Sequence, residues 1–244
     1  MSISERQTQI LSILKERNYI SVHELAQLTF TSPSSIRRDL TSMQNIGLVE
    51  RSHGGVTLPE PVRGLPSLFD RMTKNVPQKR IIAKKASSLL RNGQTIMLDG
   101  SSTASFLVPY IARLDGAVLF TNNMTTAIHA IELGIDTHVI GGHCVGNSGV
   151  LSGFEACRAV SSLHPDLLFF SSQSLSSSGI ISDSVEGENY LRTLMIAAAK
   201  KTVFLCDSEK FGTQSTFVLS SLNQIDLAFF DKPYPELRTH CQIL

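Results

Sequence analysis

Two adjacent arginines, Arg37 and Arg38, lie in the stretch TSPSSIRRDL, which covers residues 31–40. A guanidinium group presents a planar fork of N–H donors that fits a carboxylate, a phosphate or the acceptor edge of a guanine. A second cluster, DGSST at residues 99–103, combines a carboxylate with three hydroxyl groups and a glycine, and DSEKFG at residues 207–212 adds a lysine. All three clusters could bind an anion, and the elements that position them indicate which anion each one meets.

The two arginines are expected to lie on the third helix of a small N-terminal domain. Apolar residues recur at helical spacing over residues 4–17. Ser21 and Glu24, three positions apart, form the pattern of a capping box and predict the start of a second helix. The third helix is predicted to begin after Ser32, with a proline at its first position, and to end at Gly47.

The polar residues of that third helix are expected on its exposed face. Ile36, Leu40 and Met43 recur at positions i, i+4 and i+7 and should point inward. The stretch LVERSHGGVTL then predicts two short strands around an HGG turn at residues 53–55. Helix, turn, helix and hairpin in this order are typical of a winged helix-turn-helix, whose third helix fits the major groove of DNA. The residues predicted to contact DNA are Ser32, Ser34, Ser35, Arg37, Arg38, Arg51 and His53.

The alternative for the arginines is a solvated helix face, on which Arg38 pairs with Asp39 or with Glu50. The distribution of charge permits DNA binding but does not require it. Residues 1–85 hold 13 Lys and Arg against 7 Asp and Glu, whereas residues 86–244 hold 9 against 14. A basic N-terminal third on an acidic body is compatible with the binding of a polyanion.

The segment SVHELAQLTFTSPSSIRRDLTSMQNIGLVERSHGGV resembles the N-terminal domain of the DeoR-type bacterial repressors. The similarity covers a sensing-helix pattern at Glu24–Ala26, a recognition-helix pattern at Ser32–Leu40 and a wing pattern at Gly47–Val56. Ser35 stands where the family more often has threonine, and both residue types carry a hydroxyl group. By this resemblance the two arginines face DNA.

Composition and spacing exclude several classes of protein. With 42% hydrophobic and 18% charged residues, the chain is expected to be globular. No apolar run reaches the roughly 18 to 20 residues that cross a bilayer, and the polar N-terminus lacks the core of a signal peptide, so we expect a cytoplasmic protein. The four cysteines form no C-x-x-C pair and the seven histidines no H-x-x-x-H or H-E-x-x-H pattern. We therefore predict no disulfide framework, no metal site and no cofactor.

The predicted domains are a DNA-binding domain over residues 1–57, a proline-containing linker over residues 58–76 and an α/β domain over residues 77–244. In the last of these, nearly continuous apolar runs alternate with helical segments. Such a pattern predicts a mostly parallel sheet that is covered by helices on both faces. The expected helices cover residues 77–91, 102–113, 123–133, 154–163 and 185–200, and the expected strands cover residues 95–99, 117–121, 136–142, 166–172, 202–206 and 226–231.

Polar clusters follow several of these strands, including TNN at residues 121–123 and GG at residues 141–142. The carboxyl ends of parallel strands meet at one edge of a sheet, where such sheets bind ligands. A hydroxyl-rich loop that leads into a helix suits a phosphate, and Lys210 adds a positive charge. Asp99 is itself anionic, so we assign it to a sugar hydroxyl or to holding the loop. The residues predicted to bind an effector are Asp99, Gly100, Ser101, Ser102, Thr103, Asn122, Gly141, Gly142 and Lys210.

Two alternative interpretations of these residues involve only local structure. The DGSST stretch could be an ordinary helix cap, and Lys210 could be an exposed lysine that pairs with Glu209. Both interpretations need no ligand.

This part of the chain resembles the sensor domain of the same family, which is related in fold to ribose-5-phosphate isomerase and CoA transferases. The matching motifs are Lys79–Ala83, Asp99–Thr103 and Asp207–Gly212, together with the T-N and G-G pairs. The resemblance implies a phosphorylated sugar or a similar metabolite as effector. Ser101 stands where the family usually has glycine, so either the loop avoids positive φ or the preceding glycine takes the strain. Glu209 replaces a small hydroxyl residue, which could lower the affinity for an anion.

These patterns predict a DNA-binding transcriptional regulator, a repressor of a carbohydrate-metabolism operon whose operator affinity changes when a phosphorylated sugar binds. A homodimer or homotetramer is expected, because paired half-sites supply the contact surface that one small module lacks. One alternative is a sugar-phosphate isomerase-like enzyme with Asp99, Asp207 or Glu186 as the base. No acid–base pair stands out and such an enzyme has no use for a DNA-reading module, so we expect no enzyme activity. The other alternative is a regulator or interaction protein whose effector pocket no longer functions.

Overall fold

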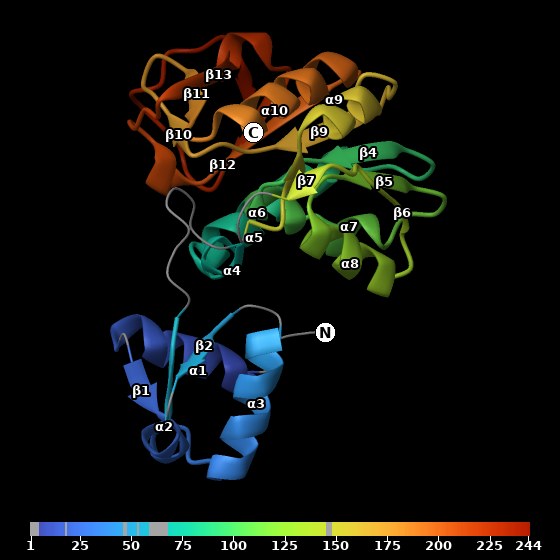
Figure 1. The fold of residues 1–244 in the computed structure, drawn as a ribbon. Coiled ribbons are helices and arrows are strands. Elements are labelled where there is room, and N and C mark those ends of the chain that lie inside the picture. Colours follow the sequence, from blue (N-terminus) through green and yellow to red (C-terminus); the bar gives the residue numbers. More distant parts are fainter. Residues whose placement is uncertain (1–4, 18, 46–47, 53, 59–67, 145–147) are drawn as a thin grey trace. The chain divides into compact units, whose positions relative to one another are not determined.

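The structure is a computed structural model that describes residues 5–17, 19–45, 48–52, 54–58, 68–144 and 148–244. Contacts between residues divide the chain into two compact units, Met1–Arg63 and Gly64–Leu244 (Figure 1). The division falls inside the segment 58–76 that the sequence assigns to a linker. Helix α4 (Leu68–Thr73) lies in the second half of that segment and belongs to the second unit.

The N-terminal unit contains the predicted three helices and hairpin. Its antiparallel sheet has the strand order β1-β3-β2, in which β2 and β3 form the hairpin. Strand β1 was not predicted, because three residues that pair with a strand far along the chain show no periodicity of their own. The elements are α1 (Glu5–Glu16), β1 (Tyr19–Ser21), α2 (Val22–Leu28), α3 (Pro33–Asn45), β2 (Glu50–Ser52) and β3 (Gly55–Thr57).

The helix starts and the core of this unit agree with the sequence pattern. Ser21 Oγ accepts a hydrogen bond from the backbone N–H of Glu24, and the Glu24 carboxylate accepts one from the backbone N–H of Ser21, which confirms the capping box. Ile36, Leu40 and Met43 on α3 are fully buried. The polar face of α3 is therefore the face turned to solvent.

A strained residue lies in the turn between α2 and α3. Phe30 has a φ of 50°, the left-handed region that residues with a side chain rarely adopt, and it is 97% exposed. The left-handed conformation brings Cβ too close to the backbone, and the exposed ring makes no compensating contact within the described part of the chain.

The C-terminal unit is built on a seven-stranded sheet with the order β15-β14-β12-β9-β4-β5-β6. Every neighbouring pair in this order is parallel, which confirms the predicted sheet. Six strands correspond to predicted ones, and β15 adds to one edge. The strands are β4 (Thr95–Leu98), β5 (Val118–Thr121), β6 (Asp136–Val139), β9 (Leu167–Phe170), β12 (Thr202–Cys206), β14 (Leu227–Phe230) and β15 (Gln242–Ile243).

Helices cover both faces of this sheet (Figure 1). One face packs against α5 (Val76–Ala86), α6 (Ser102–Ser105), α7 (Val108–Ile111) and α8 (Met124–Glu132), and the other against α9 (Phe154–Val160) and α10 (Glu186–Ala198). The single helix predicted over residues 102–113 is wrong, since two short helices stand there. Pro109 has no N–H to donate to the preceding turn, so one continuous helix cannot form.

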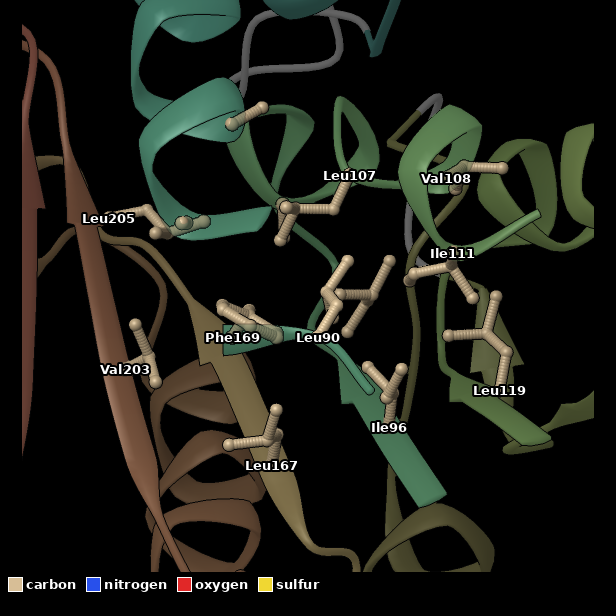
Figure 2. Packing of buried hydrophobic residues seen from close by; sticks show 14 of the residues in the cluster. Leu90, Ile96, Leu107, Val108, Ile111, Leu119, Leu167, Phe169, Val203 and Leu205 are labelled. Carbon is tan, nitrogen blue, oxygen red and sulfur yellow. The ribbon is translucent and has the colours of Figure 1, made fainter. Parts of the chain in front are cut away.

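The sheet core follows the alternation of side chains along each strand. On β9, Leu167 and Phe169 belong to the cluster beneath α5–α8, and Leu168 and Phe170 belong to the cluster beneath α9 and α10. Figure 2 shows part of the first cluster, in which side chains of the central strands meet those of the covering helices. Burial on both faces explains why the strands read as unbroken apolar runs. No helix in the described ranges is long and apolar enough to cross a membrane.

Two further small sheets were not predicted. One has the order β10-β11-β13 and is antiparallel, and the other pairs β7 with β8. Most of these strands are only two to four residues long, and all but β7 contain serine, so they lack the long apolar runs that mark the central strands. These strands are β7 (His143–Cys144), β8 (Leu151–Ser152), β10 (Ser174–Leu175), β11 (Ile180–Asp183) and β13 (Phe217–Ser221).

Replacement of Phe30 by glycine is expected to raise the free energy of unfolding by about 1 kcal/mol, because glycine adopts positive φ without the clash at Cβ. Urea denaturation of the full chain measures this change. Phe30→Ala is the matched control, since it removes the same exposed ring but keeps Cβ. An equal gain in both variants would show that the ring, and not the backbone conformation, is the destabilising feature.

Candidate functional site

The third helix, α3, presents its two arginines to solvent. Arg37 and Arg38 are exposed, and neither forms an ion pair with a residue of the described ranges. Asp39, one expected alternative partner of Arg38, is held instead by Arg6 of α1. The Arg6 Nε and Nη2 atoms lie 2.5 Å and 3.2 Å from the Asp39 carboxylate oxygens. This ion pair ties α1 to α3 and leaves both guanidinium forks open to an external partner.

Three serines form a hydroxyl cluster at the start of α3. Ser32 Oγ accepts a hydrogen bond from the backbone N–H of Ser35 at 3.3 Å, and it lies 3.0 Å from the hydroxyl oxygens of both Ser34 and Ser35. Ser32 therefore caps the helix. A helix start that carries exposed hydroxyl donors is suited to a phosphate group.

The hairpin adds one described residue to this face. Arg51 on β2 donates a hydrogen bond from Nη1 to Thr41 Oγ1 of α3 at 3.2 Å, so the hairpin arginine lies against the recognition helix. His53 and Gly47 lie outside the described residues. The structure thus brings six of the seven residues predicted to contact DNA together, at the start of α3, on α3 and on strand β2.

A cavity of about 320 Å³ opens beyond the carboxyl ends of the central strands β4, β9 and β12. Three groups of residues line it: the loops after these strands, the segment from α4 to α5, and the end of β11 with the start of α10. The lining residues are Arg71, Lys74, Asn75, Lys79, Ser101, Ser102, Thr103, Ser171, Ser172, Gln173, Asp183, Ser184, Glu188, Arg192, Asp207, Glu209 and Lys210.

The cavity includes some of the predicted effector residues and not others. Ser101, Ser102, Thr103 and Lys210 line it, and Asp99 and Gly100 precede them in the same loop. Asn122, Gly141 and Gly142 are not among the lining residues, because β5 and β6 end nearer the sheet edge.

The three residues at that edge have local contacts instead. Asn122 Nδ2 donates to the Leu151 carbonyl oxygen at 2.8 Å, which holds strand β8. A Cβ on Gly142 would lie 2.4 Å from the Ser152 carbonyl oxygen, so the backbones of this loop and β8 approach too closely for a side chain. Gly141 is exposed and has open space around its Cα.

The DGSST loop avoids positive φ. Ser101 has a φ of −80° and caps α6 by accepting a hydrogen bond from the backbone N–H of Ala104 at 3.2 Å. Gly100 is required for a different reason, since a Cβ there would lie 2.6 Å from a methyl group of Val150. The serine in place of the family's usual glycine is therefore compatible with the loop.

Asp99 is buried and holds this loop in place. Its Oδ1 accepts the backbone N–H of Ser101 at 3.1 Å, and its Oδ2 accepts the backbone N–H of Ser171 at 3.3 Å and Arg192 Nε at 2.9 Å. Arg192 is 5% exposed and also donates to Asp183 and Asn189. Sequence reasoning missed this arginine, because an arginine on an amphipathic helix ordinarily points to solvent.

Lys79 and Lys210 supply amino groups to the cavity. Lys79 is 4% exposed, and its Nζ donates to Ser102 Oγ at 3.0 Å and to the Arg71 carbonyl oxygen. Burial, together with the nearby charge of Lys210, lowers the pKa of Lys79 from 10.5 to about 8. Lys210 Nζ donates to Ser171 Oγ at 2.9 Å and lies 3.2 Å from Asp207 Oδ2, so its ionic partner is Asp207 and not Glu209.

Two donors in the cavity wall have no hydrogen-bond partner within the described part of the chain. One is the hydroxyl of Thr103, which is 1% exposed, and the other is Nε of Arg71. The remaining Arg71 nitrogens donate to the carbonyl oxygens of Ser148 at 3.0 Å and Gly100 at 3.5 Å. A buried donor without an acceptor costs about 1 to 3 kcal/mol, so both groups are suited to a ligand that brings acceptor oxygens. No group of three metal-ligating side chains is found among the described residues.

Two family models match the chain. A DeoR-like helix-turn-helix domain matches residues 6–62, and the DeoR C terminal sensor domain matches residues 74–232, which is more than half of the chain. The chain belongs to the DeoR family. It is a DNA-binding transcriptional regulator with an N-terminal helix-turn-helix domain and a C-terminal sensor domain.

Similar regulators match this DeoR-family chain over nearly its whole length. It is 32% identical over 228 residues to the HTH-type transcriptional regulator GolR of Listeria innocua, a match that covers 93% of this chain and 90% of that protein. It is 28% identical over 229 residues to the HTH-type transcriptional repressor GlcR of Bacillus subtilis, with 93% and 88% covered. Both relatives are named as regulators of transcription.

Solved structures resemble the chain more distantly. Ribose 5-phosphate isomerase A from Methanocaldococcus jannaschii is 16% identical with a TM-score of 0.43, and the match covers 57% of this chain and 55% of that one. The eIF2B delta subunit from Chaetomium thermophilum is 13% identical with a TM-score of 0.48, with 94% and 73% covered. At these values neither likeness bears on function.

The lowered pKa of Lys79 predicts a pH dependence of stability. Between about pH 8 and 10 the unfolded chain binds more protons than the folded chain, so the free energy of unfolding should rise with pH over that window. From pH 8 to 9.5 the rise due to this lysine should be about 1 to 2 kcal/mol. Chemical denaturation of the wild type and of Lys79→Met measures it, because the variant lacks the titrating group.

Lys84→Met is the matched control, since Lys84 lies on the same helix and is exposed. Lys84→Met should keep the pH dependence of the wild type, and Lys79→Met should lose it. The same slope in all three proteins would contradict the assignment of a buried, charge-destabilised amino group to Lys79.

Proposed function

We propose that this DeoR-family regulator represses a carbohydrate-metabolism operon and that a phosphorylated sugar, bound in the 320 Å³ cavity, changes its affinity for the operator. The observation that carries the proposal is the set of donors in the cavity wall. The unpartnered Thr103 hydroxyl and Arg71 Nε lie in the same wall as the amino groups of Lys79 and Lys210. Hydroxyl, guanidinium and ammonium donors together match the acceptor oxygens of a phosphate.

The regulator is further proposed to act as an oligomer in the cytoplasm. A single winged helix offers little contact surface, so the regulator reads paired half-sites as a homodimer or homotetramer. It acts in the cytoplasm, where operator DNA and phosphorylated sugars are both present. GolR and GlcR are named as regulators of transcription, which supports the same role for this chain.

The arrangement of carboxylates argues against the isomerase-like alternative. Asp99 accepts three hydrogen bonds, is paired with Arg192 and does not line the cavity, so it holds the loop and does not face a bound substrate. Asp207 accepts a hydrogen bond from Asn75 Nδ2 at 2.9 Å and lies beside Lys210. Glu186 is exposed and does not line the cavity. We therefore propose that the cavity binds its ligand without transforming it.

The unpartnered donors also argue against the alternative of a lost pocket. A buried hydroxyl and a guanidinium N–H without acceptors each lower the stability of the unliganded chain. In a cavity that no longer bound a ligand, nothing would offset that cost. Glu209, the departure from the family pattern, is exposed at the rim and forms no ion pair with Lys210.

Arg37→Ala is expected to weaken binding to the operator by about 1 to 3 kcal/mol and to relax base preference at one position in each half-site. Fluorescence anisotropy with operator and random duplex, each at two salt concentrations, separates base contact from phosphate contact. A phosphate contact would weaken both duplexes alike and reduce the salt dependence. Arg80→Ala, which removes the same charge from an exposed position of the sensor domain, is the control. Unchanged operator affinity in Arg37→Ala would rule out the assigned recognition helix.

Thr103→Val is expected to lower the affinity for phosphorylated sugars by about tenfold or more. Valine has nearly the same volume as threonine but lacks the buried hydroxyl donor. The free energy of unfolding of the variant should be equal to or above that of the wild type, since the lost hydroxyl has no partner in the unliganded chain. Calorimetric titration and thermal unfolding of the same samples measure both quantities.

Thr126→Val is the matched control. The Thr126 hydroxyl lies 2.5 Å from that of Ser105, so its removal should lower stability and leave ligand affinity unchanged. Wild-type affinity in Thr103→Val, or an equal response to unphosphorylated sugars, would disprove the phosphate site.

A further inference from the structure

The charges around the cavity are divided between two groups. Lys79 feels chiefly the charges of Lys210, Asp207, Arg71 and Lys74, so one group holds several amino groups and a single carboxylate. The second group is centred on Arg192. It contains the carboxylates of Asp99, Asp183 and Glu188, with Arg71 between the two groups. One end of the cavity is therefore suited to a divalent anion, and the other end carries an excess of negative charge.

The carboxylates of the second group differ in how far their oxygens are used. Asp99 accepts three hydrogen bonds, as described above. Asp183 accepts Arg192 Nη1 at 3.2 Å through Oδ2 and the backbone N–H of Ser184 at 2.8 Å through Oδ1. Every carboxylate oxygen of both aspartates thus already accepts a hydrogen bond from the protein.

Glu188 differs from the other carboxylates of the wall that are withdrawn from solvent, because neither of its oxygens accepts a hydrogen bond from a described residue. Within the described part of the chain, Asp207 lacks a hydrogen bond only at Oδ2, which lies 3.2 Å from Lys210 Nζ. Its nearest cationic atom is Arg192 Nη2 at 3.8 Å, which is beyond hydrogen-bond distance, and no hydrogen bond to its carboxylate is found among the described residues. Only 10% of its side chain is exposed, and the residue lines the cavity. Burial raises the pKa of Glu188, while the charges of Arg192 and Arg71 oppose that rise. A carboxylate withdrawn from water in this way is stabilised by a donor that enters the cavity.

The position of Glu188 excludes a phosphate from its own end of the cavity, because two anions at close range in a partly buried site repel one another. We propose that Glu188 is the specificity-determining residue for the other end of the ligand, where it accepts a hydrogen bond from a sugar hydroxyl remote from the phosphate. This inference rests on the proposed function of the cavity as a phosphorylated-sugar site. It identifies the ligand class as a phosphorylated polyol, with the phosphate beside Lys79 and Lys210 and a hydroxyl beside Glu188.

The inference predicts how the cavity distinguishes a phosphorylated sugar from inorganic phosphate. Both can occupy the lysine end, but only the sugar brings a donor to Glu188. The wild type should therefore bind the sugar phosphate at least tenfold more tightly than inorganic phosphate, because a site built to bond a hydroxyl rejects a ligand that lacks it. This ratio of dissociation constants is the quantity to measure.

Calorimetric titration of the full chain supplies the test, with inorganic phosphate and a panel of pentose and hexose phosphates as ligands. Glu188→Gln keeps an acceptor oxygen without the charge, and Glu188→Ala removes the acceptor. We expect the ratio to fall about tenfold in Glu188→Gln and further in Glu188→Ala, while the affinity for inorganic phosphate stays the same or rises. Thermal unfolding of each variant reports whether it is folded, and Glu188→Gln carries the test if Glu188→Ala does not fold.

Glu186→Gln is the matched control, since it removes the same charge from an exposed position on the same helix. Its ratio should equal that of the wild type. A wild-type ratio in both Glu188 variants would overturn the role of Glu188 while leaving the phosphorylated-sugar site intact. A wild-type chain that binds no compound of the panel would overturn the proposed function and this inference together. Tighter binding of an amino sugar phosphate than of its hydroxyl counterpart, lost in Glu188→Gln, would overturn the hydroxyl assignment in favour of an ammonium donor.

Discussion

The loops that line the cavity of the C-terminal unit depend on one buried ion pair, between Asp99 and Arg192. The side chains are 1% and 6% exposed. Asp99 directly follows β4 and Arg192 lies on α10, 93 positions further along the chain. Removing one partner of such a pair leaves an uncompensated buried charge, at a cost of about 3 to 5 kcal/mol. The same carboxylate accepts the backbone N–H groups of Ser101 and Ser171, so it also sets the course of two strand-end loops. Ser101 in turn caps α6, and the Ser171 hydroxyl accepts a hydrogen bond from the amino group of Lys210.

The DNA-binding unit contains a more exposed ion pair, between Arg6 and Asp39. The pairing of Arg6 with Asp39 removes the carboxylate that neighbours Arg37 and Arg38 in sequence, and so leaves both arginines on an open face. Further along the chain, α4 begins the described part of the C-terminal unit. Arg71 on α4 lines the cavity, so a ligand that engages its unpartnered Nε acts on the element nearest in sequence to the segment between the two units.

Local sequence patterns were sufficient for much of this architecture. The capping box at Ser21, the inward stripe of α3 and the apolar runs of the central strands are properties of neighbouring residues, and each predicted the right element. The rule that parallel strands end at one edge led to the Ser101–Thr103 loop and to Lys210, which the structure brings to one cavity. The same rule could not tell central strands from edge strands. It therefore included Asn122 and Gly142, which pack against β8.

The rest of the site depends on contacts between distant segments. Arg71, Lys79, Glu188 and Arg192 enter the cavity from helices on which charged residues ordinarily face solvent, and nothing in their spacing marks them as buried. The small sheets were missed because their strands are short. One predicted helix is split into α6 and α7 because of the proline within α7. Tertiary pairing, and not local propensity, decides such elements.

The proposed regulation requires that the cavity and the operator site be coupled. The most direct test is the dissociation constant of the full chain for its operator duplex, measured with and without a phosphorylated sugar that thermal unfolding shows to be bound. We expect the dissociation constant to change by about 5- to 150-fold at saturating ligand, the usual range of coupling between two sites. An operator affinity that stays constant while the cavity is saturated would contradict the proposed coupling.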